Sequence, residues 1–221
     1  MTTKFQTNNP IIYVIDNDQN IRESFAMLFG DHGYGVSCHE SADSFLRALQ
    51  SNGGLNVSCA LLEANLSDLS GIELQKLLIE QGHNIPIAFV TRYGDISTAV
   101  EAIKCGAFDF IQKPIQDDVL CKLVSEMLKK AKADQELSTE ANSMKALFKT
   151  LTSRELQILD LIVIGRCNRE ISAKLEIAIK TVEQHRANIM EKLKVKRPAG
   201  LLQFIYKYKG AKKSECSHTI N

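Results

Sequence analysis

Short apolar runs alternate with amphipathic stretches through the first half of the chain. The apolar runs are Ile11–Ile15, Gly35–Cys38, Cys59–Leu62, Ile87–Val90 and Phe108–Ile111. The amphipathic stretches between them are Arg22–Phe29, Ser44–Leu49, Gly71–Glu80 and Ile96–Cys105, and a fifth begins at Asp117. Strands that alternate with helices favour a parallel sheet with helices on both faces. The pattern therefore predicts an α/β fold built on a doubly wound five-stranded parallel sheet.

Apolar positions in the second half of the chain keep a helical spacing. Thr152 and Glu155 have the spacing of a capping box, which begins a helix that ends near Gly165. Three further helices are predicted at about 168–176, 180–194 and 198–208. The second half is therefore expected to form an all-α four-helix domain.

The change of pattern predicts the domain boundaries. We expect a first domain at 9–130, a polar and partly helical linker at 131–150, and a second domain at 151–208. The last segment, 209–221, is polar and is expected to be disordered.

Composition narrows the class of protein without identifying it. The chain is 44% hydrophobic and 24% charged, as in ordinary globular proteins. Its N-terminus lacks a secretory signal and no apolar run is long enough to span a bilayer, which predicts a cytoplasmic protein with no membrane partner. The six cysteines form no C-x-x-C pair, which excludes a zinc knuckle, and most of them, such as Cys59, lie in apolar segments and are expected to be buried free thiols.

The net charge of +1 conceals two halves of opposite sign. Residues 1–114 hold 7 Lys and Arg against 13 Asp and Glu, whereas residues 115–221 hold 20 against 13. A basic half can bind a polyanion such as nucleic acid. Two solvated surfaces of opposite sign would give the same numbers, so charge alone leaves the partner open.

Two short helices with a tight turn between them are predicted at the centre of the second half. Such a pair suits insertion into the major groove of DNA. On the second helix, one stripe consists of Val182, His185, Ile189 and Leu193, and its histidine is expected to be structural. The opposite face carries polar side chains and one alanine: Lys180, Glu183, Gln184, Ala187 and Asn188.

Residues 150–208 resemble the LuxR/FixJ-type helix-turn-helix, most specifically in the run from Thr181 to Met190. The resemblance implies double-stranded DNA as a partner and dimer contacts through the last helix. The residues that it assigns to base edges are Glu183, Gln184, Ala187 and Asn188. Those that it assigns to phosphates are Lys180, Thr181, Arg186 and Lys194. Ala178 departs from the family, which often has a capping serine there, and the lost cap costs about 1 kcal/mol.

Polar residues follow the predicted strands of the first half. Asp16 and Asn17 come after the first strand, Glu63 after the third, Thr91 after the fourth and Lys113 after the fifth. The carboxyl ends of strands in a doubly wound sheet converge on one crevice. Carboxylates beside a lysine and a hydroxyl can hold Mg²⁺ and a phosphoryl group there.

Residues 9–130 resemble the receiver domain of response regulators, which has a flavodoxin-like fold. The motifs that carry the resemblance are Ser70-Gly71, Gly94-Asp95 and the run Gly106–Pro114. It implies that Asp16 and Asn17 occupy the positions of the acidic pair. It also assigns the phosphoacceptor position to Glu63, the signalling hydroxyl to Thr91, the switch aromatic to Phe110 and the invariant lysine to Lys113. The whole chain is similar to the FixJ and TtrR branch, in which the partner is a sensor histidine kinase.

Three residues depart from the receiver pattern, and each departure has a physical consequence. Glu63 is one methylene longer than aspartate and moves its carboxylate by about 1.5 Å, which impairs in-line attack. Asn17 removes a negative charge that would attract Mg²⁺. Arg92 is bulky and cationic, and it could either replace the charge of the metal or block the phosphodonor. We therefore expect no cofactor, with Asp16 and Glu63 as the ligands if Mg²⁺ does bind.

These observations predict a DNA-binding transcriptional regulator of the two-component type that is not phosphorylated in the ordinary way. Glu63 would mimic the charge of a phosphoryl group, with Lys113 and Thr91 bonded to it directly. Three alternatives stay open: a fixed scaffold, a conventional phosphorylation-switched regulator, and a pseudo-receiver controlled by a ligand or a protein. An enzyme is not expected, because G-x-S-x-G, Walker and H-E-x-x-H motifs are absent. The resemblance further implies a homodimer through Ile96–Cys105 and Phe108–Gln112.

Overall fold

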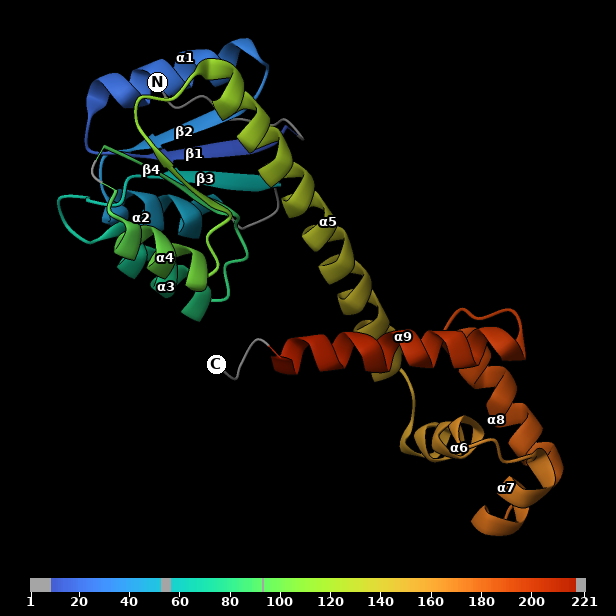
Figure 1. Ribbon diagram of the computed structural model, residues 1–221. Helices are drawn as coiled ribbons and strands as arrows, with labels where there is room; N and C mark the ends of the chain where they lie inside the picture. Colours follow the sequence, from blue (N-terminus) through green and yellow to red (C-terminus); the bar gives the residue numbers. More distant parts are fainter. Residues whose placement is uncertain (1–8, 53–56, 93, 218–221) are drawn as a thin grey trace. The chain divides into compact units, whose positions relative to one another are not determined.

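The computed structural model describes residues 9–52, 57–92 and 94–217 and divides into two compact units between residues 135 and 136. The first unit alternates strands and helices (Figure 1). Its strands are β1 (Ile11–Ile15), β2 (Gly35–His39), β3 (Ser58–Leu62), β4 (Ile87–Thr91) and β5 (Asp109–Gln112). Its helices are α1 (Gln19–Asp31), α2 (Ala42–Asn52), α3 (Gly71–Glu80), α4 (Ile96–Lys104) and the first part of α5 (Asp117–Lys149).

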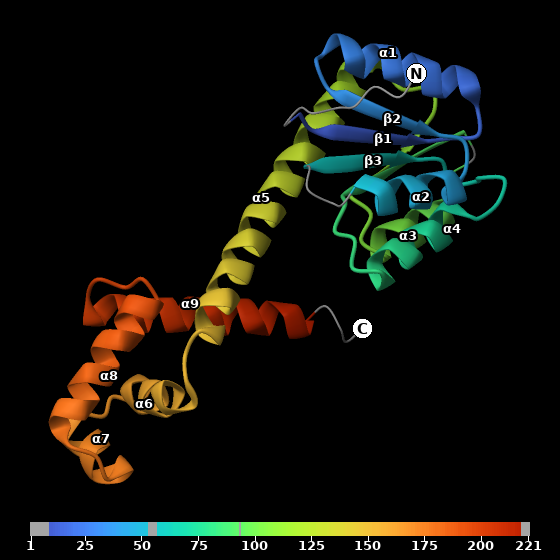
Figure 2. The same ribbon diagram turned by 180° about the vertical axis from the view of Figure 1, so that it is seen from behind.

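The five strands form one parallel sheet in the order β2-β1-β3-β4-β5. Helices α1 and α5 cover one face, and α2, α3 and α4 cover the other (Figures 1 and 2). Alternate residues of β1 serve the two faces: Ile12 and Val14 pack with α1 and α5, whereas Tyr13 and Ile15 pack with α2 and α3. Burial on both faces explains why the strands are continuous apolar runs. The prediction of a doubly wound parallel sheet is confirmed.

The parallel register brings the carboxyl ends of β1, β3, β4 and β5 to one edge of the sheet. Close packing at that edge depends on Gly71, the first residue of α3. A Cβ atom there would lie 2.6 Å from the carbonyl oxygen of Glu63 and 2.8 Å from the ring of Phe89. Glycine thus allows α3 to begin directly against the end of β3.

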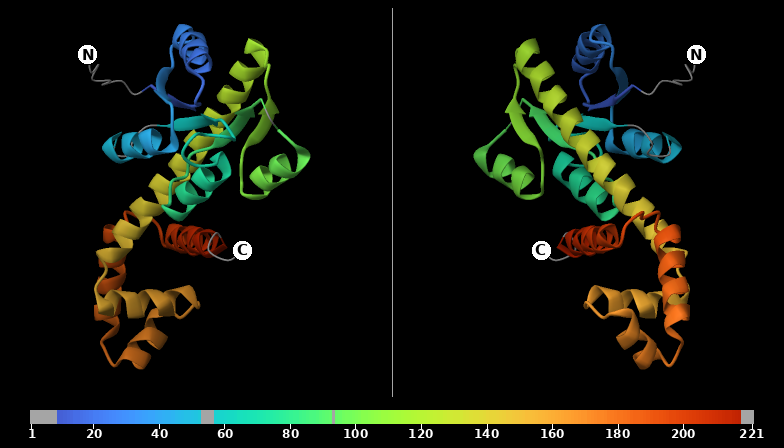
Figure 3. Two further views of the ribbon diagram at one scale, coloured as in Figure 1. Left: turned by 90° about the vertical axis from the view of Figure 1, so that its left-hand side faces the viewer. Right: turned by 90° about the vertical axis from the view of Figure 1, so that its right-hand side faces the viewer.

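The second unit is helical and contains the end of α5, α6 (Ser153–Val163), α7 (Asn168–Leu175), α8 (Ile179–Lys192) and α9 (Pro198–Ser217) (Figure 3). The predicted capping box begins α6, with Thr152 at the N-cap and Glu155 as its reciprocal acceptor. The core consists of apolar side chains from all of these helices, including Ile158, Ile171, Val182, Ile189, Leu193 and Leu201. Glu176, with φ of 53°, makes the tight turn between α7 and α8.

Several expectations about segment ends and cysteines need correction. Residues 131–149 belong to one continuous helix, because the segment contains no glycine or proline to interrupt it. Helix α9 runs to Ser217, whereas the sequence predicts a disordered tail from 209, and 218–221 lie outside the described residues. Of the described cysteines, Cys59 is buried, but two others are exposed and two are half-buried. Within the described residues, the structure contains no helix long and apolar enough to cross a membrane.

Candidate regulatory pocket and nucleic-acid interface

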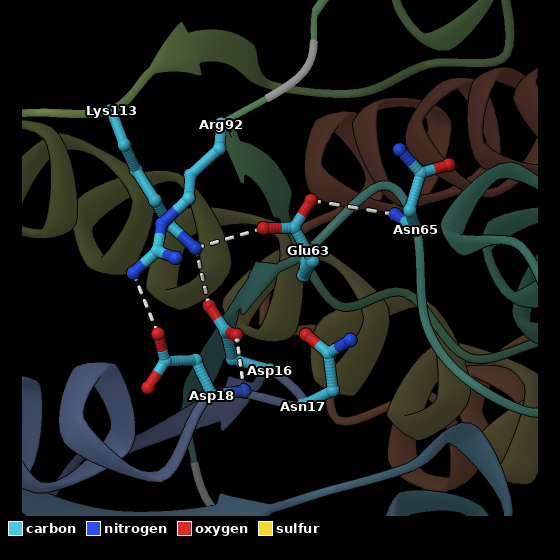
Figure 4. A pocket seen from close by; sticks show the side chains of 7 residues that line it. All are labelled: Asp16, Asn17, Asp18, Glu63, Asn65, Arg92 and Lys113. Atoms are coloured by element: carbon cyan, nitrogen blue, oxygen red, sulfur yellow. Dashed lines mark hydrogen bonds and ion pairs between the residues drawn. The ribbon is translucent and has the colours of Figure 1, made fainter.

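A cavity of about 310 Å³ lies at the carboxyl edge of the sheet (Figure 4). It is lined by seven residues: Asp16, Asn17, Asp18, Glu63, Asn65, Arg92 and Lys113. Five of these were selected from the sequence. Asp18 and Asn65 were not, although Asp18 lies one residue beyond the selected pair and Asn65 lies two residues after Glu63. Thr91 ends β4 as a fully buried residue and is not among the lining residues.

The ammonium group of Lys113 joins two carboxylates at the floor of this pocket. Its Nζ donates to Oδ2 of Asp16 at 2.5 Å and to Oε2 of Glu63 at 2.8 Å. Asp16 is 3% exposed, Glu63 is 7% exposed, and the Lys113 side chain is 7% exposed. Backbone hydrogen bonds hold the three segments together, because Glu63 N donates to Ile15 O and Lys113 N donates to Thr91 O. A buried, doubly paired lysine of this kind is costly to disrupt, since removing one partner leaves a buried charge uncompensated.

A second ion pair lies at the mouth of the pocket. The guanidinium of Arg92 donates to Oδ2 of Asp18 at 2.6 Å, and Oδ1 of Asp18 accepts from the backbone N–H of Asn20 at the start of α1. The backbone N–H of Asp18 in turn donates to Oδ1 of Asp16 at 2.9 Å. Desolvation opposes ionisation of Asp18, but the N–H of Asn20 and the charge of Arg92 outweigh it and hold the pKa of that carboxyl below its usual value.

These residues do not fit a divalent cation. Each oxygen of the three pocket carboxylates already has a donor from the protein; the weakest is the N–H of Asn65, at 3.4 Å from Oε1 of Glu63. Mg²⁺ requires hard anionic oxygens in near-octahedral positions. Two of the oxygens that face the pocket instead bind Lys113 and a third binds Arg92. Throughout the described part of the chain, no group of three or more acidic, cysteine or histidine side chains is placed to hold a metal ion.

Phe110, the switch-aromatic position, lies outside this pocket. Its half-buried ring packs on the core beneath α3 and α4 and stacks on Phe89, with ring centroids 5.8 Å apart and an interplanar angle of 28°. The neighbouring face of α4 is apolar and exposed at Ile96, Val100 and Ile103. Phe110 is thus part of β5, the strand that contacts α4.

The candidate DNA-contacting residues share the outward side of α8. Five are exposed on the helix, namely Lys180, Thr181, Glu183, Gln184 and Ala187, and Arg186 and Asn188 are half-buried. Lys194 is exposed just beyond the helix in the left-handed region, with φ of 54°. Gln184 Nε2 donates to Asn188 Oδ1 at 2.9 Å, so the two amides form a single polar unit. His185 is half-buried, with an Nδ1 that has no hydrogen-bond partner among the described residues.

Polar contacts from α6 and α7 fix the position of α8. Lys192, the last residue of α8, donates to Oε2 of the buried Glu155 at 2.7 Å. Arg154 donates to the carbonyl oxygen of Leu175 at the end of α7, and Ser172 donates to the carbonyl oxygen of Ile177 in the turn. These contacts hold a short, solvent-facing helix on a small core.

The two units match two known domain families. Residues 12–125 match the response regulator receiver domain, and residues 149–204 match the LuxR family of bacterial regulatory proteins. The chain belongs to the response regulators. Its FixJ-type organisation, a receiver followed by a LuxR-type DNA-binding domain, is confirmed.

Relatives of this response regulator match both units. The response regulator protein TmoT of Ectopseudomonas mendocina is 34% identical over 203 residues, which are 92% of this chain and 91% of that protein. The transcriptional regulatory protein FixJ of Rhizobium meliloti is 38% identical over 189 residues, which are 84% of this chain and 89% of that protein. These relatives are regulators and not enzymes, in agreement with the expectation from the sequence.

Two solved structures are also similar to this chain over most of its length. The response regulator StyR matches with a TM-score of 0.83 and 34% identity, over 90% of this chain and all of that chain. Full-length FixJ from B. japonicum matches with a TM-score of 0.54 and 33% identity, over 90% of this chain and 97% of that chain. The receiver fold and the helix-turn-helix expected from the sequence are therefore both present.

Proposed function

We propose that this response regulator binds promoter DNA through α8 and that its receiver acts without phosphotransfer. The observation that carries the proposal is the buried hydrogen bond between Lys113 and Glu63. It provides a carboxylate charge, already bonded to the family's lysine, at the acceptor position. The charge that phosphorylation would introduce is in this way built into the side chain.

The geometry of Glu63 also disfavours attack on a phosphodonor. A nucleophilic carboxylate needs an oxygen free to approach the donor in line. Oε2 of Glu63 is bonded to Lys113, and Oε1 lies 3.4 Å from the N–H of Asn65. Arg92 further occupies the mouth through which a donor would enter. A sensor histidine kinase is a partner of receivers in general, but DNA binding by this protein does not require it.

The DNA-binding part of the proposal assigns roles to the outward side of α8. Gln184, Ala187 and Asn188, with Glu183, read base edges in the major groove. The residues that contact phosphates are Lys180, Thr181, Arg186 and Lys194. The protein acts in the cytoplasm, where the DNA lies. Two copies paired through α4 and β5 place two such helices on half-sites about one turn of DNA apart. The exposed apolar side chains of Ile96, Val100 and Ile103 support this pairing.

Phosphotransfer is tested by incubating the full chain with a small acyl-phosphate donor and Mg²⁺, followed by intact-mass measurement. We expect no phosphoryl adduct and unchanged affinity for DNA. A stable gain of one phosphoryl group that disappears in Glu63→Ala would overturn this part of the proposal. Because an acyl phosphate is short-lived, a BeF₃⁻ complex is measured in parallel, and it too is expected to leave DNA affinity unchanged.

The role of the Glu63 charge is tested by Glu63→Gln, which keeps the shape and removes the charge. If the carboxylate mimics a phosphoryl group, the variant binds DNA about tenfold more weakly. The dependence of the DNA affinity on salt concentration should stay the same. A fixed scaffold is the second candidate, and it is favoured by the additional bond from Lys113 to Asp16. On that candidate Glu63→Gln loses stability but binds DNA as the wild type does once folding is verified by circular dichroism.

DNA binding itself is tested with a sequence selected from random duplexes. The affinity should fall steeply as salt is raised, because cations bound to the phosphates are released on binding. Affinity that hardly changes between low and high salt would contradict phosphate contacts by α8.

A further inference from the structure

The charges of the side chains that line the pocket are nearly balanced. Three carboxylates, from Asp16, Asp18 and Glu63, face two cations, from Lys113 and Arg92, so that the formal charge is −1. Asn17 contributes an amide and no charge. A carboxylate cluster left at −3 would attract a divalent cation, whereas this one is largely neutralised by its own side chains.

The two cations differ in how firmly they are held. Lys113 is buried to 7% exposure and bonded to both floor carboxylates. Arg92 is 56% exposed and reaches across the mouth from the end of β4 to Asp18, which is 74 residues earlier in the chain. Figure 4 shows this guanidinium directed toward the loop that follows β1, which carries Asp16, Asn17 and Asp18.

Arg92 thus bonds the carboxylate that directly follows Asp16 and Asn17, the two residues at the acidic-pair positions of a receiver. Both carboxylate oxygens of Asp18 are already bonded, Oδ2 to the Arg92 guanidinium and Oδ1 to the backbone N–H of Asn20. The backbone N–H of Asp18 donates to Oδ1 of Asp16, which connects the mouth of the pocket to its floor. Arg92 neutralises the carboxylate of Asp18 at the mouth of the pocket.

We infer that the Arg92 guanidinium takes the place of the divalent cation in this receiver, so that Arg92 excludes Mg²⁺ from the pocket. The inference deepens the proposed phosphotransfer-independent function, on which it rests, by naming the residue that makes the pocket independent of metal. Replacing Arg92 by a neutral residue changes the formal charge of the pocket from −1 to −2, which matches the charge of one divalent cation. The loss of charge at Asn17 alone does not explain the exclusion, because Asp18 supplies a carboxylate next to it.

The test uses the full chain and Mn²⁺ as the probe, with free Mn²⁺ counted by electron paramagnetic resonance and Mg²⁺ added as competitor. Wild type should show no saturable site up to millimolar Mn²⁺. Arg92→Gln and Arg92→Ala should each gain one site whose Kd is at least about tenfold tighter than any wild-type binding, and Mg²⁺ should displace the ion. Arg92→Lys, which keeps the charge, should behave as the wild type does.

Arg47→Gln is the matched control, because Arg47 also forms an exposed ion pair with an aspartate, Asp43, on the same unit. It changes the net charge equally but should gain no site. Wild type that binds Mn²⁺ as tightly as Arg92→Gln, or Arg47→Gln that gains the same site, would overturn the inference. So would neutral Arg92 variants that are folded by circular dichroism and gain nothing. Phosphoryl uptake by the wild type is read separately by mass, and therefore failure of the proposed function is distinguishable from failure of this inference.

Discussion

Gly94 lies directly against the ring of Phe110. A Cβ atom at Gly94 would come within 2.6 Å of Cε1 and 3.1 Å of Cζ of that ring, and within 3.4 Å of Cγ2 of Thr91. The absence of a side chain at Gly94 therefore lets the ring pack inward on Phe89 beside the buried end of β4. One glycine connects the switch-aromatic position with the loop that carries Arg92.

Gly94→Ala is expected to displace the Phe110 ring and to destabilise the first unit by about 1–3 kcal/mol, the usual cost of overpacking. Urea unfolding of the full chain measures the loss, and DNA affinity measured alongside it reports whether the ring position is communicated to α8. The control is Gly30→Ala in α1, where an added Cβ meets nothing within 4 Å. That variant should be neutral or slightly stabilising. Equal effects of the two variants would contradict the close approach of Gly94 and Phe110.

Ala178→Ser should stabilise the second unit by about 1 kcal/mol. Ala178 is the N-cap of α8, its backbone is extended with φ of −63° and ψ of 145°, and it has no side-chain acceptor for the first N–H groups of the helix. A serine in this conformation supplies the acceptor. Thermal unfolding of the second unit measures the gain. The comparison is Ala173→Ser, at an exposed position in the middle of α7. It should give no gain in stability, because serine is a poorer helix former than alanine.

Glu155→Gln should make the second unit less stable at neutral pH by about 1.5–3 kcal/mol, the usual range for a hydrogen bond to a charged group. Desolvation raises the pKa of Glu155, but hydrogen bonds from Lys192 and Thr152 outweigh it, so the pKa lies below its ordinary value of 4.5. A depressed pKa contributes stability above pH 4.5 that disappears as the pH falls through the folded-state pKa.

The measurement is urea unfolding of wild type and Glu155→Gln at neutral pH and at steps below pH 4.5. The difference in free energy of unfolding between them should shrink as the pH falls. Glu191→Gln, an exposed change on α8, should show no such pH-dependent difference. A Glu155→Gln difference that stays constant down to acid unfolding would contradict the assignment.

Gln184→Ala and Lys180→Ala should weaken DNA binding in different ways. Loss of the Gln184 amide, which is bonded to Asn188, should cost about 1–3 kcal/mol for the selected sequence and little for random DNA. Loss of Lys180 should weaken binding to both and lower the salt slope by about 1. Titrations on both duplexes at several salt concentrations separate the two effects. Lys122→Ala, an exposed change on α5, should leave both affinities unchanged. If this variant lost as much DNA affinity as Lys180→Ala does, the effect of Lys180 would be one of overall charge and not of a phosphate contact.

Periodicity in the sequence predicted the strands and helices to within a few residues, because apolar side chains must alternate or recur to reach a core. The ends of α5 and α9 were the exceptions. The polar character of residues 131–149 predicts a linker that is only partly helical, yet the segment contains good helix formers and continues α5 to Lys149. Helix α9 likewise continues beyond its last apolar residues to Ser217. Polarity alone separates exposed from buried segments, and it does not separate exposed helix from coil.

The sequence by itself determined that three of the pocket residues lie at one edge of the sheet. Parallel strands end at one edge, so Asp16, Glu63 and Lys113 had to lie near one another. Only the tertiary structure decided how their charges pair. Lys113 joins two carboxylates that are 97 and 50 residues away in the chain, and Arg92 reaches Asp18 across 74 residues. Side-chain pairing of this kind depends on rotamers, burial and distances of a few ångströms, which strand order and residue type leave undetermined.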